Sequence, residues 1–317
     1  ANEVNAHPHL SGRAAIVHNG IIENFQALRR EMEEQGRVFE SETDSEAIAQ
    51  LLGAFMDEGL DAVEAFEKTL SRLTGAFAIA AVFAGEPGLL LGARRGSPLV
   101  LGYGEGEMYL GSDAIALAPL TRDVTYLEDG DWVVAGPDRA EIRDSRGRGV
   151  HRPRQQSRVE AALIERGDYD HFMLKEIEEQ PGALARSIIP YIDEARLSVE
   201  LGAEAEALFA GADRAIAVSC GTAYYAASTA KYWFEDIARL PLEVDIASEF
   251  RYRNPVLPQT GPALFVSQSG ETADTLAALR YCRARGMASM AIVNVPESSI
   301  AREASALLPT RAGPEIG

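Results

Sequence analysis

Two short polar loops in the second half of the chain combine residue types that bind anions. Ser219-Cys220-Gly221-Thr222 and Ser267-Gln268-Ser269-Gly270-Glu271-Thr272 each follow an apolar run typical of a strand and open a helical pattern. Glycine lets a backbone approach a ligand closely, and the first N–H groups of a helix attract negative charge. Hydroxyl groups add short donors and acceptors at Thr222, Ser267, Ser269 and Thr272. The two loops therefore predict a phosphate site that uses neither lysine nor arginine.

Helix capping is the alternative explanation for the same residues. Ser, Thr and Gly are ordinary residues at helix starts, so either loop alone could serve only as a cap. Two such loops at strand ends of one parallel sheet favour a ligand, because such ends meet at the edge where ligands bind. We interpret Cys220 as a small packing residue rather than a nucleophile, because no basic residue stands beside it.

A second polar cluster lies in the first half, where Asn5, His7 and His9 precede His18-Asn19-Gly20 and Glu42-Thr43-Asp44. Asn19 and Gly20 can present a side-chain amide and a backbone N–H together, which suits an oxyanion hole. Asp44 could cap a helix or hold a substrate ammonium group, and its spacing favours the cap. The positions of His7, His9 and His18 match no standard zinc pattern, so we predict no metal site.

In the first half of the sequence, where this cluster lies, most helical patterns precede the strand patterns. An apolar strand over 14–18 should end at an Asn19-Gly20 turn, and helical stripes should follow from Ile21 to Met32, after a Thr43–Glu46 capping box, and from Val63 to Leu73. Alternating residues then predict strands near 77–83, 89–91, 99–101, 108–110, 124–127 and 132–134. Helices followed by runs of strands predict an α+β layered sandwich.

Strands and helices alternate in the second half. We expect strands at 215–219, 242–246, 263–266 and 288–294, and helices at 172–189, 223–238, near 248, at 272–285 and near 299. Pro181 should lie near a helix start or at a kink. Alternating apolar strands and helices predict an α/β parallel sheet that is covered on both faces. A Gly-, Pro- and Arg-rich stretch near residue 155 separates the two halves.

Composition excludes several classes of function. The chain has 317 residues, and at very roughly 150 residues per domain it should form two domains. A net charge of −18 disfavours nucleic acid as the main ligand. Cys220 and Cys282 are the only cysteines, which predicts a reducing compartment without a disulfide framework. No apolar run approaches the roughly 20 residues that span a bilayer, so we expect no membrane insertion.

At these motifs the sequence resembles the glucosamine-6-phosphate synthase family, the isomerising glutamine–fructose-6-phosphate amidotransferases. The resemblance covers essentially the whole chain in order. It rests on the motifs Asn5-Ala-His-Pro-His9, Val17-His-Asn-Gly-Ile-Ile-Glu-Asn24, Ser41-Glu-Thr-Asp44, Gly96-Ser-Pro-Leu99, Ser112-Asp113, Phe172-Met-Leu-Lys-Glu-Ile-Glu-Glu-Gln-Pro181, Cys220-Gly-Thr222, Ala247-Ser-Glu-Phe-Arg-Tyr252 and Ser267-Gln-Ser-Gly-Glu-Thr-Ala-Asp-Thr275.

The resemblance implies a two-part mechanism without a cofactor. In the family, an N-terminal-nucleophile domain releases ammonia from glutamine, the ammonia crosses an internal channel, and a sugar isomerase (SIS) half adds it to fructose 6-phosphate. Carried over by residue, Asn19 and the Gly20 backbone form the oxyanion hole, Asp44 binds the α-amino group of glutamine, and His7 lies near the glutamine pocket. The residues implied to bind the sugar phosphate are Thr222, Ser267, Gln268, Ser269 and Thr272.

The chain also departs from the family pattern. The family's nucleophilic Cys should precede Ala1 and its second isomerase domain should follow Gly317, so we expect an internal fragment that is inactive alone. The only lysines, Lys68, Lys175 and Lys231, match none of the family's catalytic positions. Ala223 stands where many relatives carry Ser, which removes one hydroxyl near the phosphate.

The resemblance implies three segments: a glutaminase domain at 1–155, a linker with a helical segment at 156–190, and a first SIS domain at 191–317. It implies a cytoplasmic enzyme that is at least a homodimer when complete, with glutamine and fructose 6-phosphate as its partners. Three alternatives remain: a non-catalytic phosphosugar-binding regulator, an amidotransferase with a phosphoribosyl acceptor, and a structural scaffold. The Ser-Gln-Ser-Gly-Glu-Thr loop argues against the phosphoribosyl acceptor, because such sites usually pair acids with a Gly/Thr loop.

Overall fold

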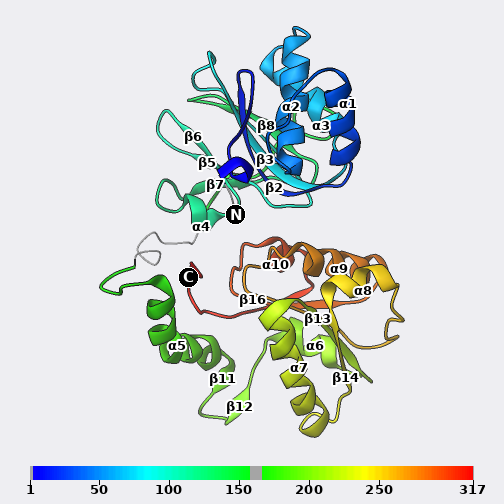
Figure 1. Cartoon of the computed structure of the whole chain (residues 1–317). Coiled ribbons are helices and arrows are strands. Elements are labelled where there is room, and N and C mark those ends of the chain that lie inside the picture. Colours follow the sequence, from blue (N-terminus) through cyan, green and yellow to red (C-terminus); the bar gives the residue numbers. More distant parts are fainter. Residues whose placement is uncertain (1–2, 158–165, 317) are drawn as a thin grey trace. The chain divides into compact units, whose positions relative to one another are not determined.

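The chain divides into two compact units, Ala1–Ala161 and Ala162–Gly317, in a computed structural model that describes residues 3–157 and 166–316 (Figure 1). Each unit has its own sheets and its own buried core.

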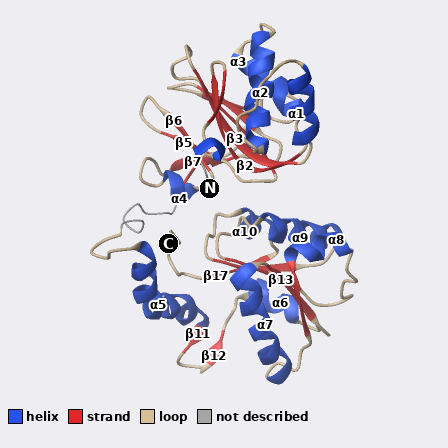
Figure 2. Cartoon of the chain, viewed as in Figure 1, coloured by secondary structure: helices blue, strands red, loops and turns tan. Residues whose placement is uncertain are grey.

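The first unit is built on a six-stranded antiparallel sheet in the order β1-β2-β3-β4-β8-β9. Its strands are β1 (His9–Ser11), β2 (Ala14–Ile22), β3 (Gly75–Phe83), β4 (Leu90–Arg95), β8 (Trp132–Ala135) and β9 (Ala140–Arg143). Helices α1 (Phe25–Glu34), α2 (Asp44–Asp57) and α3 (Ala62–Arg72) pack on one face of this sheet, as Figure 2 shows. Alternate strand residues such as Ile16, Ile22 and Ile79 are buried against these helices.

A second sheet covers the opposite face. Its order is β10-β7-β5-β6, formed by β5 (Val100–Tyr103), β6 (Met108–Gly111), β7 (Asp123–Tyr126) and β10 (Gln155–Gln156), and the short helix α4 (Ala114–Leu117) packs on it. Ala78, Leu101 and Val133 are buried between the two sheets. A 3-10 helix, Glu3–Asn5, precedes β1. The helices and the two sheets form the α+β sandwich that the sequence predicts.

The predicted turn at Asn19-Gly20 is wrong. Strand β2 continues to Ile22, with Asn19 opposite Ala78 and Gly20 opposite Phe77 in β3, and α1 begins only at Phe25. Gly20 has a φ of 133°, and a Cβ atom there would overlap the carbonyl oxygen of Ala76. The glycine therefore serves a close approach between two strands, and pairing with a distant strand outweighs the local turn preference of Asn-Gly.

The second unit contains a five-stranded parallel sheet in the order β14-β13-β15-β16-β17. The strands are β13 (Ala215–Ser219), β14 (Leu242–Ile246), β15 (Ala263–Ser267), β16 (Ser289–Val293) and β17 (Ala306–Pro309). Helices α8 (Ala247–Arg253), α9 (Ala273–Ala284) and α10 (Ser299–Glu303) bury one face, which includes Ile216 and Val218. Helices α6 (Ala203–Phe209) and α7 (Gly221–Asp236) bury the other, which includes Ala215 and Ala217. The predicted α/β parallel sheet with two covered faces is confirmed.

Helix α5 (Phe172–Ile188) precedes this sheet together with a 3-10 helix, Ile189–Tyr191, and the hairpin β11 (Ile192–Asp193) and β12 (Ser198–Val199). Pro181 lies inside α5 rather than at its start, and Figure 2 shows that the helix bends along its length. Within residues 3–157 and 166–316, we find no helix with the length and apolar character that a membrane crossing requires.

Candidate functional site

Asp44 is the first residue of α2, and its carboxylate is tied to strand β2. Thr43 is the N-cap, and its hydroxyl accepts a hydrogen bond of 3.3 Å from the Glu46 N–H, so the prediction of Asp44 as the cap is wrong. Asp44 Oδ2 instead accepts a hydrogen bond of 2.8 Å from the Ile22 N–H. The Asp44 side chain is 23% exposed, and its other oxygen, Oδ1, lies 4.0 Å from His18 Nδ1.

Asn19 and Gly20 lie on the same strand as Ile22. Strand β1 pairs with β2 only from Ala14 to Ile16, so it does not cover the edge beyond Ile16. In an antiparallel ladder, the N–H groups of alternate residues point to the same edge, which directs the Gly20 N–H to the edge where Ile22 contacts Asp44. The Asn19 side chain is exposed and makes no hydrogen bond with any residue in the described part of the chain.

Two histidine rings lie within hydrogen-bond distance of the hydroxyl of Ser45, the residue that follows Asp44. His18 Nδ1 lies 2.9 Å from Ser45 Oγ, and His7 Nε2 lies 3.1 Å from the same oxygen. His18 is buried, and within the described residues its Nε2 has no hydrogen-bond partner. Burial lowers the pKa of His18, the charge of Asp44 opposes that shift, and His7 and His9 add to it. His18 is therefore neutral at neutral pH.

His9 belongs to a different network from His7. Its Nε2 lies 3.1 Å from Thr43 Oγ1, and its ring meets the His7 ring edge-on with centroids 5.3 Å apart. Burial lowers the pKa of His9, His7 lowers it further, and Glu46 and Asp44 act to raise it. Across residues 3–157 and 166–316, His, Cys, Asp and Glu form no group of three or more that could hold a metal ion.

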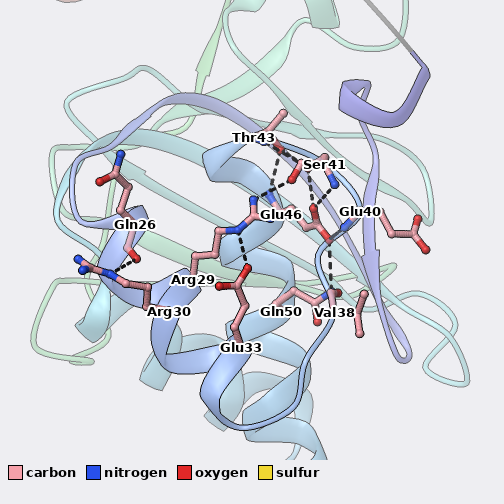
Figure 3. A network of polar contacts seen from close by, with 10 residues as sticks. All are labelled: Gln26, Arg29, Arg30, Glu33, Val38, Glu40, Ser41, Thr43, Glu46 and Gln50. Atoms are coloured by element: carbon pink, nitrogen blue, oxygen red, sulfur yellow. Dashed lines mark hydrogen bonds and ion pairs between the residues drawn. The ribbon is translucent and has the colours of Figure 1, made fainter.

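Glu46 is the residue at this site that the sequence interpretation missed. It is only 4% exposed, and its carboxylate accepts hydrogen bonds from the Ser41 N–H (2.6 Å), the Ser41 hydroxyl (2.7 Å) and the Glu40 N–H (2.9 Å), as Figure 3 shows. In an ordinary capping box, this Glu would return to the N–H of the cap residue, here Thr43. The Thr43–Glu46 pattern was the only signal: it predicts the Thr43 cap, which is observed, and a return hydrogen bond from the Thr43 N–H to Glu46, which is not.

Arg29 holds the same loop from α1. Its Nη1 donates a hydrogen bond of 2.8 Å to the Ser41 carbonyl oxygen, and its Nε donates one of 2.9 Å to Glu33 (Figure 3). Gln50 adds a hydrogen bond of 3.1 Å from its side chain to the Val38 carbonyl oxygen. Side chains of α1 and α2 therefore hold the segment that leads into Asp44.

In the second unit, the two predicted anion-binding loops lie side by side. Strands β13 and β15 are parallel neighbours, with Ser219 opposite Val266, so both loops leave the same edge of the sheet. Helix α7 begins at Gly221, its N-cap Cys220 makes no side-chain cap bond, and Thr222 is exposed. Helix α9 begins after Thr272, which likewise makes no side-chain cap bond. Simple capping therefore does not account for either loop.

The second loop is held by its own hydroxyls and by α10. Ser267 is buried, and its Oγ accepts the Gly270 N–H at 3.0 Å and lies 3.0 Å from Thr272 Oγ1. Ser269 is exposed, and its hydroxyl accepts the Glu271 N–H at 3.1 Å. Gly270 has a φ of 66°, and a Cβ there would overlap the Ser298 hydroxyl. Ser267 shapes the loop, and Ser269 faces the outside.

Neither cysteine has the character of an activated nucleophile. Cys282 is fully buried, and burial raises its pKa to about 12. Cys220 is half-buried and packs against the core formed by α8, α9 and the sheet. This position agrees with the interpretation of Cys220 as a packing residue.

Comparison with known proteins links both loops and the Asp44 cluster to two domain families. Residues 3–119 match the glutamine amidotransferase domain, and residues 208–317 match the SIS domain. Glutamine–fructose-6-phosphate aminotransferase [isomerizing] of Bradyrhizobium diazoefficiens is 52% identical over 99% of this chain and 52% of its own length. The enzyme of the same name from Brucella abortus is 54% identical over 99% of this chain and 52% of its own length.

Among solved structures, the C-terminal domain of the Francisella tularensis glucosamine-fructose-6-phosphate aminotransferase is 43% identical over 48% of this chain and 43% of that one, with a TM-score of 0.46. The chain spans about half the length of the curated relatives it matches. Over almost its whole length the chain is similar to about half of an isomerising glutamine–fructose-6-phosphate aminotransferase, and within this similarity the match to a glutamine amidotransferase domain is followed by the match to an SIS domain.

Proposed function

We propose that this chain supplies substrate-binding parts of an enzyme that makes glucosamine 6-phosphate from fructose 6-phosphate and glutamine. The observation that carries the proposal is that each candidate site lies in a segment matching a domain of the required chemistry. Asp44 lies within the glutamine amidotransferase match, and the 220–222 and 267–272 loops lie within the SIS match.

The first unit would bind glutamine. The Asp44 carboxylate, fixed by the Ile22 N–H, would hold the α-amino group, and His7 would lie beside it on Ser45. When the side-chain amide is attacked, its oxygen becomes negative. The Asn19 amide and the Gly20 N–H would stabilise that charge, because donors aimed at a developing oxyanion lower the barrier most.

The second unit would bind the phosphate of the sugar. The first backbone N–H groups of α7 and α9 would face the phosphate, and five side chains would line the same edge: Thr222, Ser267, Gln268, Ser269 and Thr272. The internal hydrogen bonds of Ser267 suggest that it acts mainly by shaping the loop. Ala223 contributes no hydroxyl to this edge.

We further propose a glutaminase domain at 1–155, a linker with a helical segment at 156–190 and an SIS domain at 191–317, with ammonia passing between the active domains. The complete enzyme would be a cytoplasmic homodimer that binds neither nucleic acid nor membranes. The names of the relatives favour this enzyme over a non-catalytic phosphosugar-binding regulator, a phosphoribosyl-acceptor amidotransferase or a scaffold.

An assay of the complete gene product tests the proposal. Glutamine and fructose 6-phosphate should yield glucosamine 6-phosphate and glutamate in equal amounts, and Asp44→Asn should raise the KM for glutamine. Calorimetry on this chain should show fructose 6-phosphate binding that Thr222→Ala weakens. Sugar-phosphate binding without turnover by the complete protein would favour the regulator, and the absence of both would overturn the proposal.

A further inference from the structure

Glu46 combines burial with a side chain that is hydrogen-bonded to the loop preceding α2. It is 4% exposed, and it lies two positions after Asp44 on α2. Burial acts to raise the pKa of Glu46, but hydrogen bonds from Ser41, the Glu40 and Ser41 backbone and Gln50 outweigh that effect and lower it. Glu46 is therefore a buried carboxylate that stays ionised at neutral pH.

The charge of Glu46 sets the direction of a series of hydrogen bonds that joins four side chains. A carboxylate only accepts, so the Ser41 hydroxyl must donate to Glu46 Oε2 across 2.7 Å. Ser41 Oγ then accepts from the Thr43 hydroxyl at 2.9 Å. Thr43 Oγ1 in turn accepts from His9 Nε2–H at 3.1 Å. The protons run in one order from His9 to Glu46, and His9 is held as the tautomer with its proton on Nε2.

Asp44 lies between this series of hydrogen bonds and a second one. Thr43, the preceding residue, belongs to the series of hydrogen bonds that ends on Glu46. Ser45, the following residue, bridges His18 and His7. Among the described residues, the Asp44 carboxylate accepts a hydrogen bond only through Oδ2, from the Ile22 N–H, while its Oδ1 lies 4.0 Å from His18 Nδ1. The direction of Oδ1 therefore depends on how the first turn of α2 is held, and Thr43 starts that turn.

We propose that Glu46 is a positioning residue of the glutamine site, which fixes the cap residue Thr43 through Ser41 and thereby aims Asp44 at the α-amino group of the substrate. This inference rests on the proposed role of Asp44. Glu46 touches no substrate, and its effect is confined to the ammonium contact. A glutamine analogue without an α-amino group should therefore be insensitive to Glu46.

Three substitutions separate positioning from charge and from stability. Glu46→Gln keeps the size but places an NH₂ group against donors at Ser41 or Glu40. Ser41→Ala interrupts the series of hydrogen bonds but leaves the carboxylate and its backbone hydrogen bonds, so it serves as a milder second variant. Glu42→Gln is the matched control, because Glu42 is an exposed acid in the same loop whose side chain makes no hydrogen bond or ion pair with the described residues.

The test is calorimetric titration of the chain and its variants with L-glutamine and with glutaramate, which lacks only the α-amino group. The unmodified chain should prefer glutamine. Glu46→Gln and Ser41→Ala should reduce that preference about tenfold, because a misdirected carboxylate weakens its charge-assisted hydrogen bond to the ammonium group. Asp44→Asn should abolish the preference, and Glu42→Gln should keep it. Nitrogen-15 NMR of the His9 ring should show the Nε2–H tautomer in the unmodified chain and its loss in Glu46→Gln.

Each outcome has a distinct meaning. If Asp44→Asn abolishes the preference while Glu46→Gln and Ser41→Ala retain it, the positioning role is overturned and the glutamine site stands. Equal weakening of both ligands would also overturn positioning, because it would indicate a general structural defect. No glutamine binding by the unmodified chain, or an unchanged preference in Asp44→Asn, would overturn the glutamine site itself. In that case, the His9 tautomer would still report whether Glu46 sets the direction of the hydrogen bonds that lead from His9.

Discussion

The backbone N–H of Ile22 donates a 2.8 Å hydrogen bond to Asp44 Oδ2, which ties the start of α2 to the strand that carries Asn19 and Gly20. This bond joins residues that are far apart in the sequence. It places the carboxylate that we propose to hold a substrate ammonium beside the strand edge to which the Gly20 N–H points, and the predictions for the first unit depend on that arrangement.

Removal of the Asn19 amide should impair glutamine hydrolysis. In the complete gene product, Asn19→Ala should lower glutaminase turnover by about 10²–10³-fold, as expected for the loss of one oxyanion donor. Gln26→Ala on the exposed face of α1 removes an amide away from the site and should leave turnover unchanged. Steady-state glutamate release measures both variants. Unchanged kinetics for Asn19→Ala would exclude Asn19 from the oxyanion hole.

Removal of the Ser269 hydroxyl should affect only the sugar site. Ser269→Ala should weaken fructose 6-phosphate binding by about tenfold or more, because a hydrogen bond to a charged group contributes about 1.5–3 kcal/mol. Basal glutaminase activity should stay near its original value. Ser198→Ala, in the hairpin strand β12, is the control for loss of a serine hydroxyl. Calorimetric affinities that are equal for Ser269→Ala and Ser198→Ala would contradict the assignment.

The glycine at position 270 should be needed for more than its backbone angle. Gly270 and Gly286 both have positive φ, at 66° and 75°, but only a Cβ at 270 would overlap Ser298. Gly286→Ala should cost about 1–2 kcal/mol of unfolding free energy, the penalty of a left-handed backbone for a non-glycine residue. Gly270→Ala should cost more and should also weaken fructose 6-phosphate binding. Equal denaturation midpoints for the two variants would show that the overlap is relieved without cost.

The stability of the first unit should fall as the pH drops below about 6.5. The pKa of His18 is lowered from 6.5 in the folded state by burial, an effect that Asp44 opposes and that His7 and His9 reinforce. Above pH 6.5, both states are neutral at His18. Below it, the unfolded chain takes up a proton first, so the folded state loses up to about 1.4 kcal/mol per pH unit for each such histidine.

Urea unfolding between pH 5 and 8 measures this dependence. His18→Gln, which cannot be protonated, should show a shallower loss of stability below pH 6.5 than the unmodified chain. His151→Gln, at an exposed histidine, should keep the original profile. A His18→Gln profile parallel to that of the unmodified chain would rule out His18 as a source of the acid sensitivity.

Local sequence patterns determined most of the element types. Alternating and helical spacings predicted the sandwich, the parallel sheet and the two polar loops at its strand ends, because side-chain periodicity follows directly from backbone geometry. The Thr43 cap and the loop hydroxyls were also readable, since a cap contacts residues only three positions away.

The tertiary structure decided what depends on distant partners. Asn19-Gly20 became a paired strand because Gly20 lies close to Ala76 in β3, and no local pattern records that approach. Glu46 accepts N–H groups from the preceding loop rather than from its own cap, because α1 and α2 hold that loop against it. The sequence by itself determined which residues could do chemistry. Only the packing of strands and helices decided how Asp44 is oriented, because that orientation depends on hydrogen bonds between residues that are remote in the chain.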